Sequence, residues 1–268
     1  MRLTRASITI LCYYIIIVTW WFVLYVQGIK FSPINYWYQF AFGLIPLIGG
    51  ITGMIRAHEW GLFKSKVGIA LACISAGLIT WGIGQMFWSI YYNVILGIEV
   101  PYPSLADIGY ILSWPLWSIG IIHLARATGA HVSLKSMMGK LLLFIVPIIF
   151  IALSYYLLIV VARDGTITDL SESYAKIFFD LAYPIGDVVI LTLAVLIFGL
   201  SINYLGGKYR ISILTLLLGF VINYIVDFAF SYTTTQETYY NGHWVDLLFP
   251  TAMMLIAVAV NNFSTEVD

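Results

Sequence analysis

The sequence predicts an all-α integral membrane protein with eight transmembrane helices. Of its 268 residues, 61% are hydrophobic and only 10% are Asp, Glu, Lys or Arg, whereas an ordinary soluble domain carries about 25% charged residues. Apolar runs of about 20 residues, the length that crosses a hydrocarbon core of about 30 Å, follow one another along the chain. These runs lack the two-residue alternation of barrel strands, so helices are the expected spanning elements.

Charged or turn-forming residues bound each apolar run and define the spans in order. The expected spans are residues 7–27, 35–55, 67–92, 105–126, 139–162, 175–201, 210–233 and 243–261. The first run follows a basic N-terminus like a signal peptide, but it is too long and has no small-x-small cleavage site, so we expect it to be retained. No polar segment is long enough to fold separately in water, which places the function in the membrane bundle.

Lys and Arg gather on one side of these spans. Ten of the thirteen lie at the N-terminus or in the loops after the second, fourth and sixth spans, and only Lys30, Arg163 and Lys176 lie on the other side. The positive-inside rule therefore predicts a cell membrane protein with both termini in the cytoplasm and loop 93–104 outside. Zero net charge argues against nucleic acid as a partner, and the expected surroundings are the lipid bilayer.

A weak internal repeat relates the two halves of the chain. Placing Gly77 on Gly219 aligns the third span with the seventh, and each then carries a polar stripe at i, i+4 and i+8 on one helix face. The stripes are Trp81, Gln85 and Ser89 in the third span and Asn223, Asp227 and Ser231 in the seventh. We interpret the chain as one membrane domain of two parallel four-helix repeats, residues 1–133 and 134–268. The alternative is a chance likeness between two apolar helices.

The start of the fourth span carries the most distinctive motif. Residues 101–112 are Pro-Tyr-Pro-Ser-Leu-Ala-Asp-Ile-Gly-Tyr-Ile-Leu, followed by Trp114-Pro115-Leu116. This Pro-Ser-x-Ala-Asp-x-x-Tyr motif resembles the multi-span N-terminal membrane regions of bacterial diguanylate cyclases, phosphodiesterases and histidine kinases. Residues 182–187 and 246–248 resemble the second half of those regions. The resemblance implies a sensory or ligand-binding module, and because no output domain follows the last span, a separate cytoplasmic signalling protein is the implied partner.

Five carboxylates fall inside the predicted spans, where an ionisable side chain costs several kcal/mol unless it faces a cavity or a partner. They are Asp107, Asp180, Asp187, Asp227 and Asp246. All lie in the outer half or the centre of the bundle, and we expect no embedded Lys or Arg to neutralise them. Asp180, Tyr183 and Asp187 share one face of the sixth span beside a proline.

This face is expected to meet the polar stripes of the third and seventh spans and to form an outward-facing pocket. The predicted ligand-binding residues are Asp180, Asp187, Asp227, Asn223, Gln85, Tyr183, Trp81, Asp107 and Asp246. Carboxylates and aromatic rings together favour a small cation. Two alternatives stay open: desolvation keeps some of the acids neutral and hydrogen-bonded, and Asp107 and Asp246 cap their helices.

Metal and catalytic motifs are scarce. His243 precedes Asp246 by one helical turn, but two ligands do not make a metal site. The sequence has no nucleophile elbow, zincin motif or phosphate-binding glycine loop, so we expect a protein that is not an enzyme, and no cofactor is identified.

The leading hypothesis is a sensory membrane protein that binds a small, cationic or hydrogen-bonding ligand from outside and signals through a cytoplasmic partner. The second hypothesis is a proton- or cation-coupled transporter, because Asp187 beside Pro184 at mid-depth is typical of a transport site. The third is a scaffold without a ligand.

Overall fold

The computed structural model describes residues 3–127, 137–167, 173–201 and 209–265, and every regular element within them is helical. The elements are α1 (Arg5–Val26), α2 (Pro33–Glu59), η1 (Leu62–Lys64), α3 (Lys66–Met86), η2 (Phe87–Leu96), α4 (Leu105–Ala127), α6 (Met137–Ser154), η3 (Tyr155–Val161), α7 (Tyr174–Ser201), α8 (Arg210–Thr235) and α9 (Val245–Asn261). Each predicted span coincides with one helix to within a few residues, while the predicted boundary at residue 133 lies outside the described residues.

Seven helices, counting α3–η2 and α6–η3 as one each, are long and apolar enough to cross a membrane. The chain is therefore a multi-pass helical membrane protein. The last predicted span corresponds to α9, a shorter apolar helix of 17 residues, so the count of eight crossings stays a prediction. Two spans end in π-helical segments, η2 and η3, and η2 stops at Gly97, whose φ of +63° is a conformation that favours glycine.

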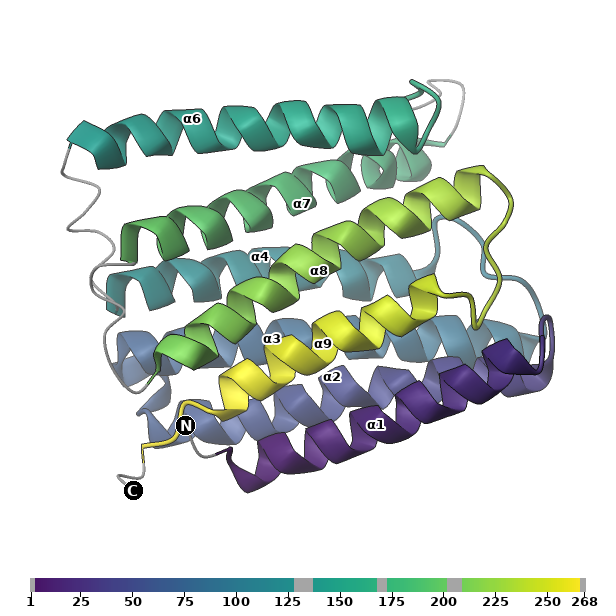
Figure 1. The fold of residues 1–268 in the computed structure, drawn as a ribbon, viewed down its shortest axis with the longest axis horizontal. Coiled ribbons are helices and arrows are strands. Elements are labelled where there is room, and N and C mark those ends of the chain that lie inside the picture. Colours follow the sequence, from purple (N-terminus) through teal and green to yellow (C-terminus); the bar gives the residue numbers. More distant parts are fainter. Residues whose placement is uncertain (1–2, 128–136, 168–172, 202–208, 266–268) are drawn as a thin grey trace.

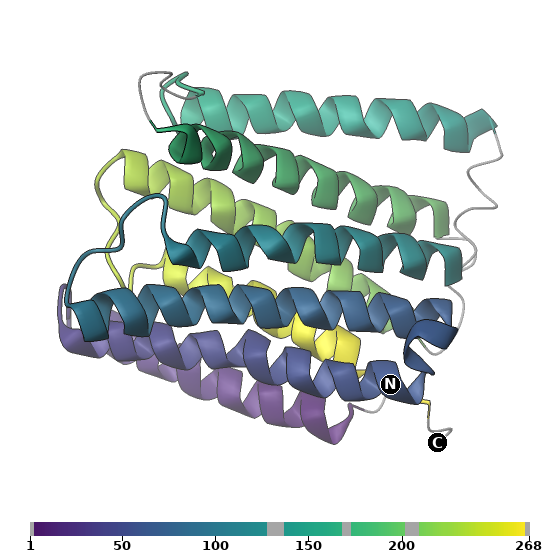
Figure 2. The same cartoon turned by 180° about the vertical axis from the view of Figure 1, so that it is seen from behind.

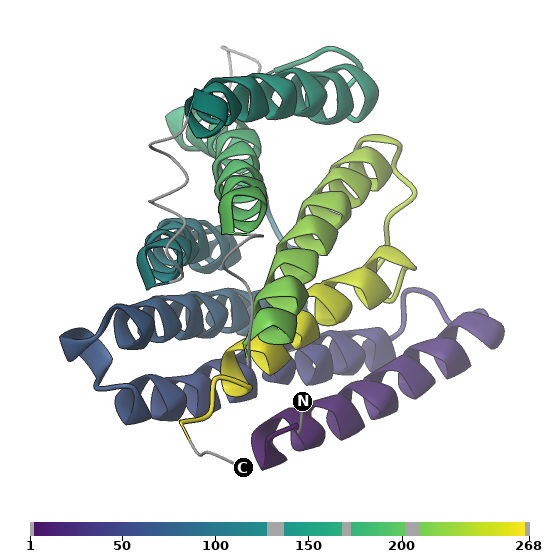
Figure 3. The ribbon, with the colours of Figure 1, turned by 60° about the vertical axis from the view of Figure 1, so that its left-hand side comes forward.

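The helices pack side by side, with α1 at one edge of the bundle and α6 at the opposite edge (Figures 1 and 2). Helix α8 crosses its neighbours obliquely (Figure 3), and α9 packs against α1, α2 and α8. The first residues of α1 and the end of α9 are joined, because the Thr4 backbone N–H donates to Asn262 Oδ1 at 3.2 Å and its hydroxyl to the Asn261 carbonyl at 3.1 Å.

Apolar side chains cover the outer surface of the bundle. Ile15 and Ile16 of α1 are 62% and 59% exposed, and Phe144 and Ile148 of α6 are 71% and 63% exposed. In water such a surface would be unstable, so these faces are the ones that contact lipid.

Helices α3 and α4 approach each other closely through glycines. A Cβ atom on Gly109 of α4 would lie 2.7 Å from Gly84 Cα and 2.7 Å from the Thr80 carbonyl oxygen of α3. Helix α2 approaches α9 in the same manner at Gly49, where a Cβ atom would lie 2.2 Å from Ala257 Cβ. Small residues let membrane helices gain van der Waals contact in the absence of a hydrophobic driving force.

We expect Gly109→Val to destabilise the bundle by about 1–3 kcal/mol, because the added methyl groups have to displace backbone atoms of α3. The matched control is Ile108→Val at the neighbouring position, which is 50% exposed and should change stability little. Thermal unfolding of both variants in the same detergent measures the difference, and equal unfolding temperatures would contradict the close contact.

Candidate functional site

A cavity of about 620 Å³ lies between α2, α3, α4, α7, α8 and α9. It reaches the loops that join α1 to α2, η2 to α4 and α8 to α9, which is the side predicted to face outward. All nine residues predicted to bind a ligand line it: Asp180, Asp187, Asp227, Asn223, Gln85, Tyr183, Trp81, Asp107 and Asp246. These nine residues therefore surround one common cavity, while their role in binding stays a prediction.

Asp246, in the first turn of α9, is the centre of a hydrogen-bond network. Its Oδ2 accepts the Gly242 backbone N–H at 2.6 Å and the side-chain amide of Gln39 from α2. Its Oδ1 accepts the hydroxyl of Tyr239 at 2.9 Å. Burial and the neighbouring Asp246 raise the pKa of Tyr239, in the loop before α9, so this hydroxyl stays a donor.

The network continues from Gln39 across the cavity wall. Gln85 Nε2 donates to Gln39 Oε1 at 2.6 Å, and the Tyr110 hydroxyl donates to Gln85 Oε1 at 2.7 Å. One chain of hydrogen bonds therefore connects α4, α3, α2 and α9, and it satisfies polar groups that would otherwise be buried without partners.

Asp107, in the first turn of α4, also combines a local contact with a contact to a distant helix. Its Oδ2 accepts the Ser104 backbone N–H at 2.6 Å, as the side chain at position N3 of a capping box does, and it also accepts the Ser104 hydroxyl at 2.8 Å. Its Oδ1 accepts the Tyr183 hydroxyl of α7 at 2.6 Å. Asp107 thus makes a capping contact at the start of α4, whereas Asp246 binds the loop before α9 and no side chain caps that helix. Both residues line the cavity as well.

A second acidic cluster lies between α7 and α8. Asp187 of α7 and Asp227 of α8 both line the cavity. Asn223 Nδ2 donates to Asp227 Oδ2 at 2.8 Å. The buried Asn223 Oδ1 has no hydrogen-bond partner among the described residues, so the cluster offers an unused acceptor at the cavity wall.

The expectation that no base accompanies the carboxylates is wrong for Asp180. Arg163, in the loop after η3, donates to the Asp180 carbonyl at 3.0 Å, and its guanidinium lies 3.9 Å from Asp180 Oδ1. The Tyr102 hydroxyl donates to Asp180 Oδ1 at 2.9 Å. Arg163 also donates to the Ser231 hydroxyl at 3.3 Å. The sequence could not indicate this because Arg163 is 17 residues before Asp180, in a loop whose path only the fold defines.

Aromatic rings form much of the remaining wall. Trp81 lies 5.2 Å from Tyr110 and 5.8 Å from Phe249, measured between ring centroids. Trp114 meets Tyr183 edge-on at 5.0 Å. These rings line the cavity together with charged side chains. Among the described residues, six acidic side chains and one basic side chain line it. The cavity is therefore acidic, and acidic aromatic cavities attract cations.

The structure does not assemble a metal site around His243 and Asp246. Both oxygens of Asp246 are engaged in hydrogen bonds, and the described residues contain no group of three His, Cys, Asp or Glu side chains that could hold a metal ion. Burial and the positive charge of Lys30 lower the pKa of His243, which lies in the loop before α9.

Sequence reasoning missed Gln39, Tyr239 and Arg163 as parts of the site. Gln39 had a usable signal, since Asn35 and Gln39 are four residues apart in an otherwise apolar span and so share a helix face. Tyr239 and Arg163 come from loops, where no periodic pattern indicates direction.

No family model, curated protein or solved structure matches the chain.

We expect His243 to make the folded state less stable as the pH is lowered below about 6.5, the ordinary pKa of histidine. The folded state keeps His243 neutral at pH values where the unfolded chain takes up a proton, so its contribution to stability is lost as the pH falls toward the lowered pKa. Unfolding of wild type and His243→Gln between about pH 7.5 and 5.5 checks this: the unfolding temperature of wild type should fall relative to that of the variant. Coincident pH profiles would contradict it.

Proposed function

We propose that this chain is a multi-pass sensory protein of the cell membrane that binds a small cationic ligand in the acidic cavity. The observation that carries the proposal is the cavity of about 620 Å³, a volume typical of sites for small molecules, in which carboxylates stand against aromatic faces. The unused Asn223 Oδ1 supplies a neutral acceptor for an N–H group of such a ligand.

The proposal includes eight crossings in two parallel repeats with both termini in the cytoplasm. Two inter-repeat contacts support it, because α4 packs on α7 and α9 packs on α2, which are equivalent pairs of fourth and second helices. In each pair the first-turn aspartate of the fourth helix accepts a hydrogen bond from the second helix: Tyr183 donates to Asp107, and Gln39 to Asp246. Two repeats related by a two-fold axis would make such equivalent contacts.

Signal transfer in this proposal uses a shift between two packings of the bundle, which the ligand biases by binding one of them better. The basic ends of the helices, Arg56–Lys66 and Arg126–Lys140, would dock a cytoplasmic signalling protein; the second range lies partly outside the described residues. The motif at residues 103–110 supports this reading through its resemblance to sensor regions of cyclases and kinases.

Butyltrimethylammonium is a suitable probe, because its charge does not change with pH. We expect it to raise the unfolding temperature of wild type reconstituted in nanodiscs, and we expect Asp227→Asn to weaken its binding at least tenfold, about 1.4 kcal/mol. The matched control, Glu59→Gln, removes a carboxylate at the opposite end of α2 and should leave affinity unchanged. No binding to wild type, or equal loss in both variants, would contradict the cation site.

A proton- or cation-coupled transporter is the second candidate, favoured by Asp187 of α7 and Asp227 of α8, two carboxyl groups inside membrane-crossing helices that line the same cavity. A carboxyl group can exchange its proton for a cation, which is the coupling that an exchanger needs.

For this candidate we expect cation-driven proton movement in proteoliposomes that Asp187→Asn abolishes, because an amide side chain cannot take up and release a proton. Glu59→Gln again serves as the control and should retain flux. Ligand binding without flux in wild type would contradict the transporter and leave the sensor.

A further inference from the structure

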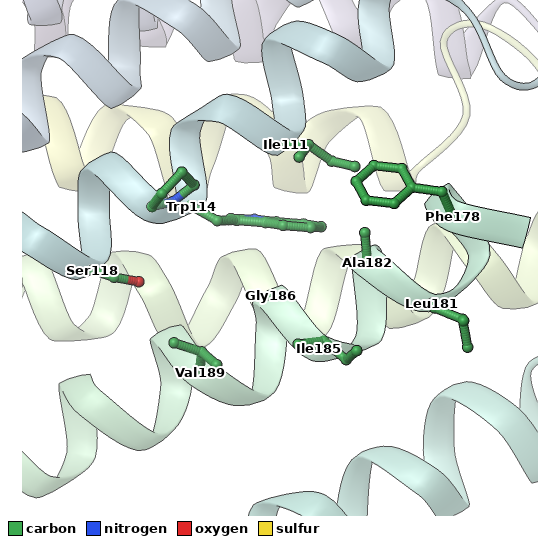
Figure 4. Close-up of a pocket in the computed structure, with 10 residues that line it drawn as sticks. Ile111, Trp114, Ser118, Phe178, Leu181, Ala182, Ile185, Gly186 and Val189 are labelled. Carbon is green, nitrogen blue, oxygen red and sulfur yellow. The ribbon is translucent and has the colours of Figure 1, made fainter. Parts of the chain in front are cut away.

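A second hollow lies on the outside of the bundle, between α4 and α7, with a volume of about 410 Å³ (Figure 4). Figure 4 shows Ile111 and Ser118 on α4 facing Ala182 and Val189 on α7. Apart from the Ser118 hydroxyl and the indole N–H of Trp114, its lining side chains are hydrocarbon. We call it the α4–α7 groove.

The α4–α7 groove opens on the apolar surface that contacts lipid. Phe178, Ile185 and Val189 of α7 border it and are 57%, 61% and 42% exposed. Both bordering helices are long and apolar enough to cross a membrane, so the groove faces the hydrocarbon region of the bilayer and not water.

Trp114 belongs to the groove and to the acidic cavity at once, since its side chain lines both. On the cavity side it meets Tyr183, the hydrogen-bond donor of Asp107, at 5.0 Å between ring centroids. On the groove side its ring lies against Gly186, where a Cβ atom would come within 2.0 Å of it. One indole ring therefore lines both a hydrocarbon groove and a carboxylate-lined cavity.

We propose that the ligand is an amphiphile that is dissolved in the bilayer, with a cationic head bound in the acidic cavity and an alkyl chain bound in the α4–α7 groove. This inference rests on the proposed function and specifies the chemical class of its ligand. The head matches the charge of the cavity, and the chain matches the hydrocarbon lining of the groove. Trp114 lines both sites, so it lies where the two parts of such a molecule would join.

The geometry favours an amphiphile over a fully hydrophilic cation, because a hydrophilic ligand would use only the cavity and gain nothing from a groove that opens to lipid. An amphiphile in the membrane already has its chain in hydrocarbon, so moving the chain into the α4–α7 groove exchanges one apolar environment for another at little cost. The head then gains the attraction of the carboxylates in a medium of low dielectric constant.

The test compares two probes with the same head, butyltrimethylammonium and dodecyltrimethylammonium, in nanodiscs of fixed lipid composition, with the long probe at low mole fraction. Ala182→Phe fills the α4–α7 groove from α7, and Ser118→Phe fills it from α4. The matched control is Ala152→Phe on the exposed surface of α6. Unfolding temperatures establish that each variant is folded, and dodecanol serves as the uncharged chain.

We expect both groove variants to weaken binding of dodecyltrimethylammonium at least tenfold and to change binding of butyltrimethylammonium less than twofold, while Ala152→Phe alters neither. Unchanged affinity for the long probe in both folded groove variants would contradict binding of the alkyl chain in the α4–α7 groove, although binding of the short probe would still support the cation site. Equal loss of affinity for both probes would also contradict binding of the chain in the groove, because the substitutions would then act through the cavity. Binding of dodecanol as tight as that of the charged long probe, or no binding of either cation by wild type, would overturn the cation site and this inference together.

Discussion

Every buried carboxylate in a membrane bundle requires hydrogen-bond donors or a proton, because neither water nor lipid can supply them there. Asp246 obtains donors from its own preceding loop and from Gln39 of α2. Asp107 obtains them from Ser104 and from Tyr183 of α7. These bonds connect helices that are far apart in the sequence, so the pairing of α9 with α2 and of α4 with α7 follows the positions of the acids.

Capping and cavity formation are compatible uses of the same residues. A carboxylate in the first turn of a helix satisfies local N–H groups and opposes the positive end of the dipole. The same carboxylate can also accept a donor from elsewhere in the fold, as Asp107 accepts the Tyr183 hydroxyl and Asp246 accepts the Gln39 side-chain amide. The mouth of the cavity is thereby built from helix ends, which places its negative charge close to the loops.

Asp187 and Asp227 line the same cavity from positions several residues inside α7 and α8. Asp227 obtains a donor from Asn223, one turn earlier on its own helix. These two acids are the part of the cavity on which the sensor and transporter proposals both depend.

The sequence by itself determined the helical membrane class, the limits of the helices and the set of carboxylates, because hydropathy and charge act over about 20 consecutive residues and need no tertiary information. The i, i+4 stripes correctly indicated Gln85, Asn223 and Asp227 as inward-facing. Only the tertiary structure decided that Arg163 meets Asp180, that Tyr239 and Gln39 bind Asp246, and that Trp114 lines both the α4–α7 groove and the cavity. Such contacts depend on the paths of the loops, on how each helix is rotated about its axis and on which helices pack together. No periodic pattern along the sequence predicts these features.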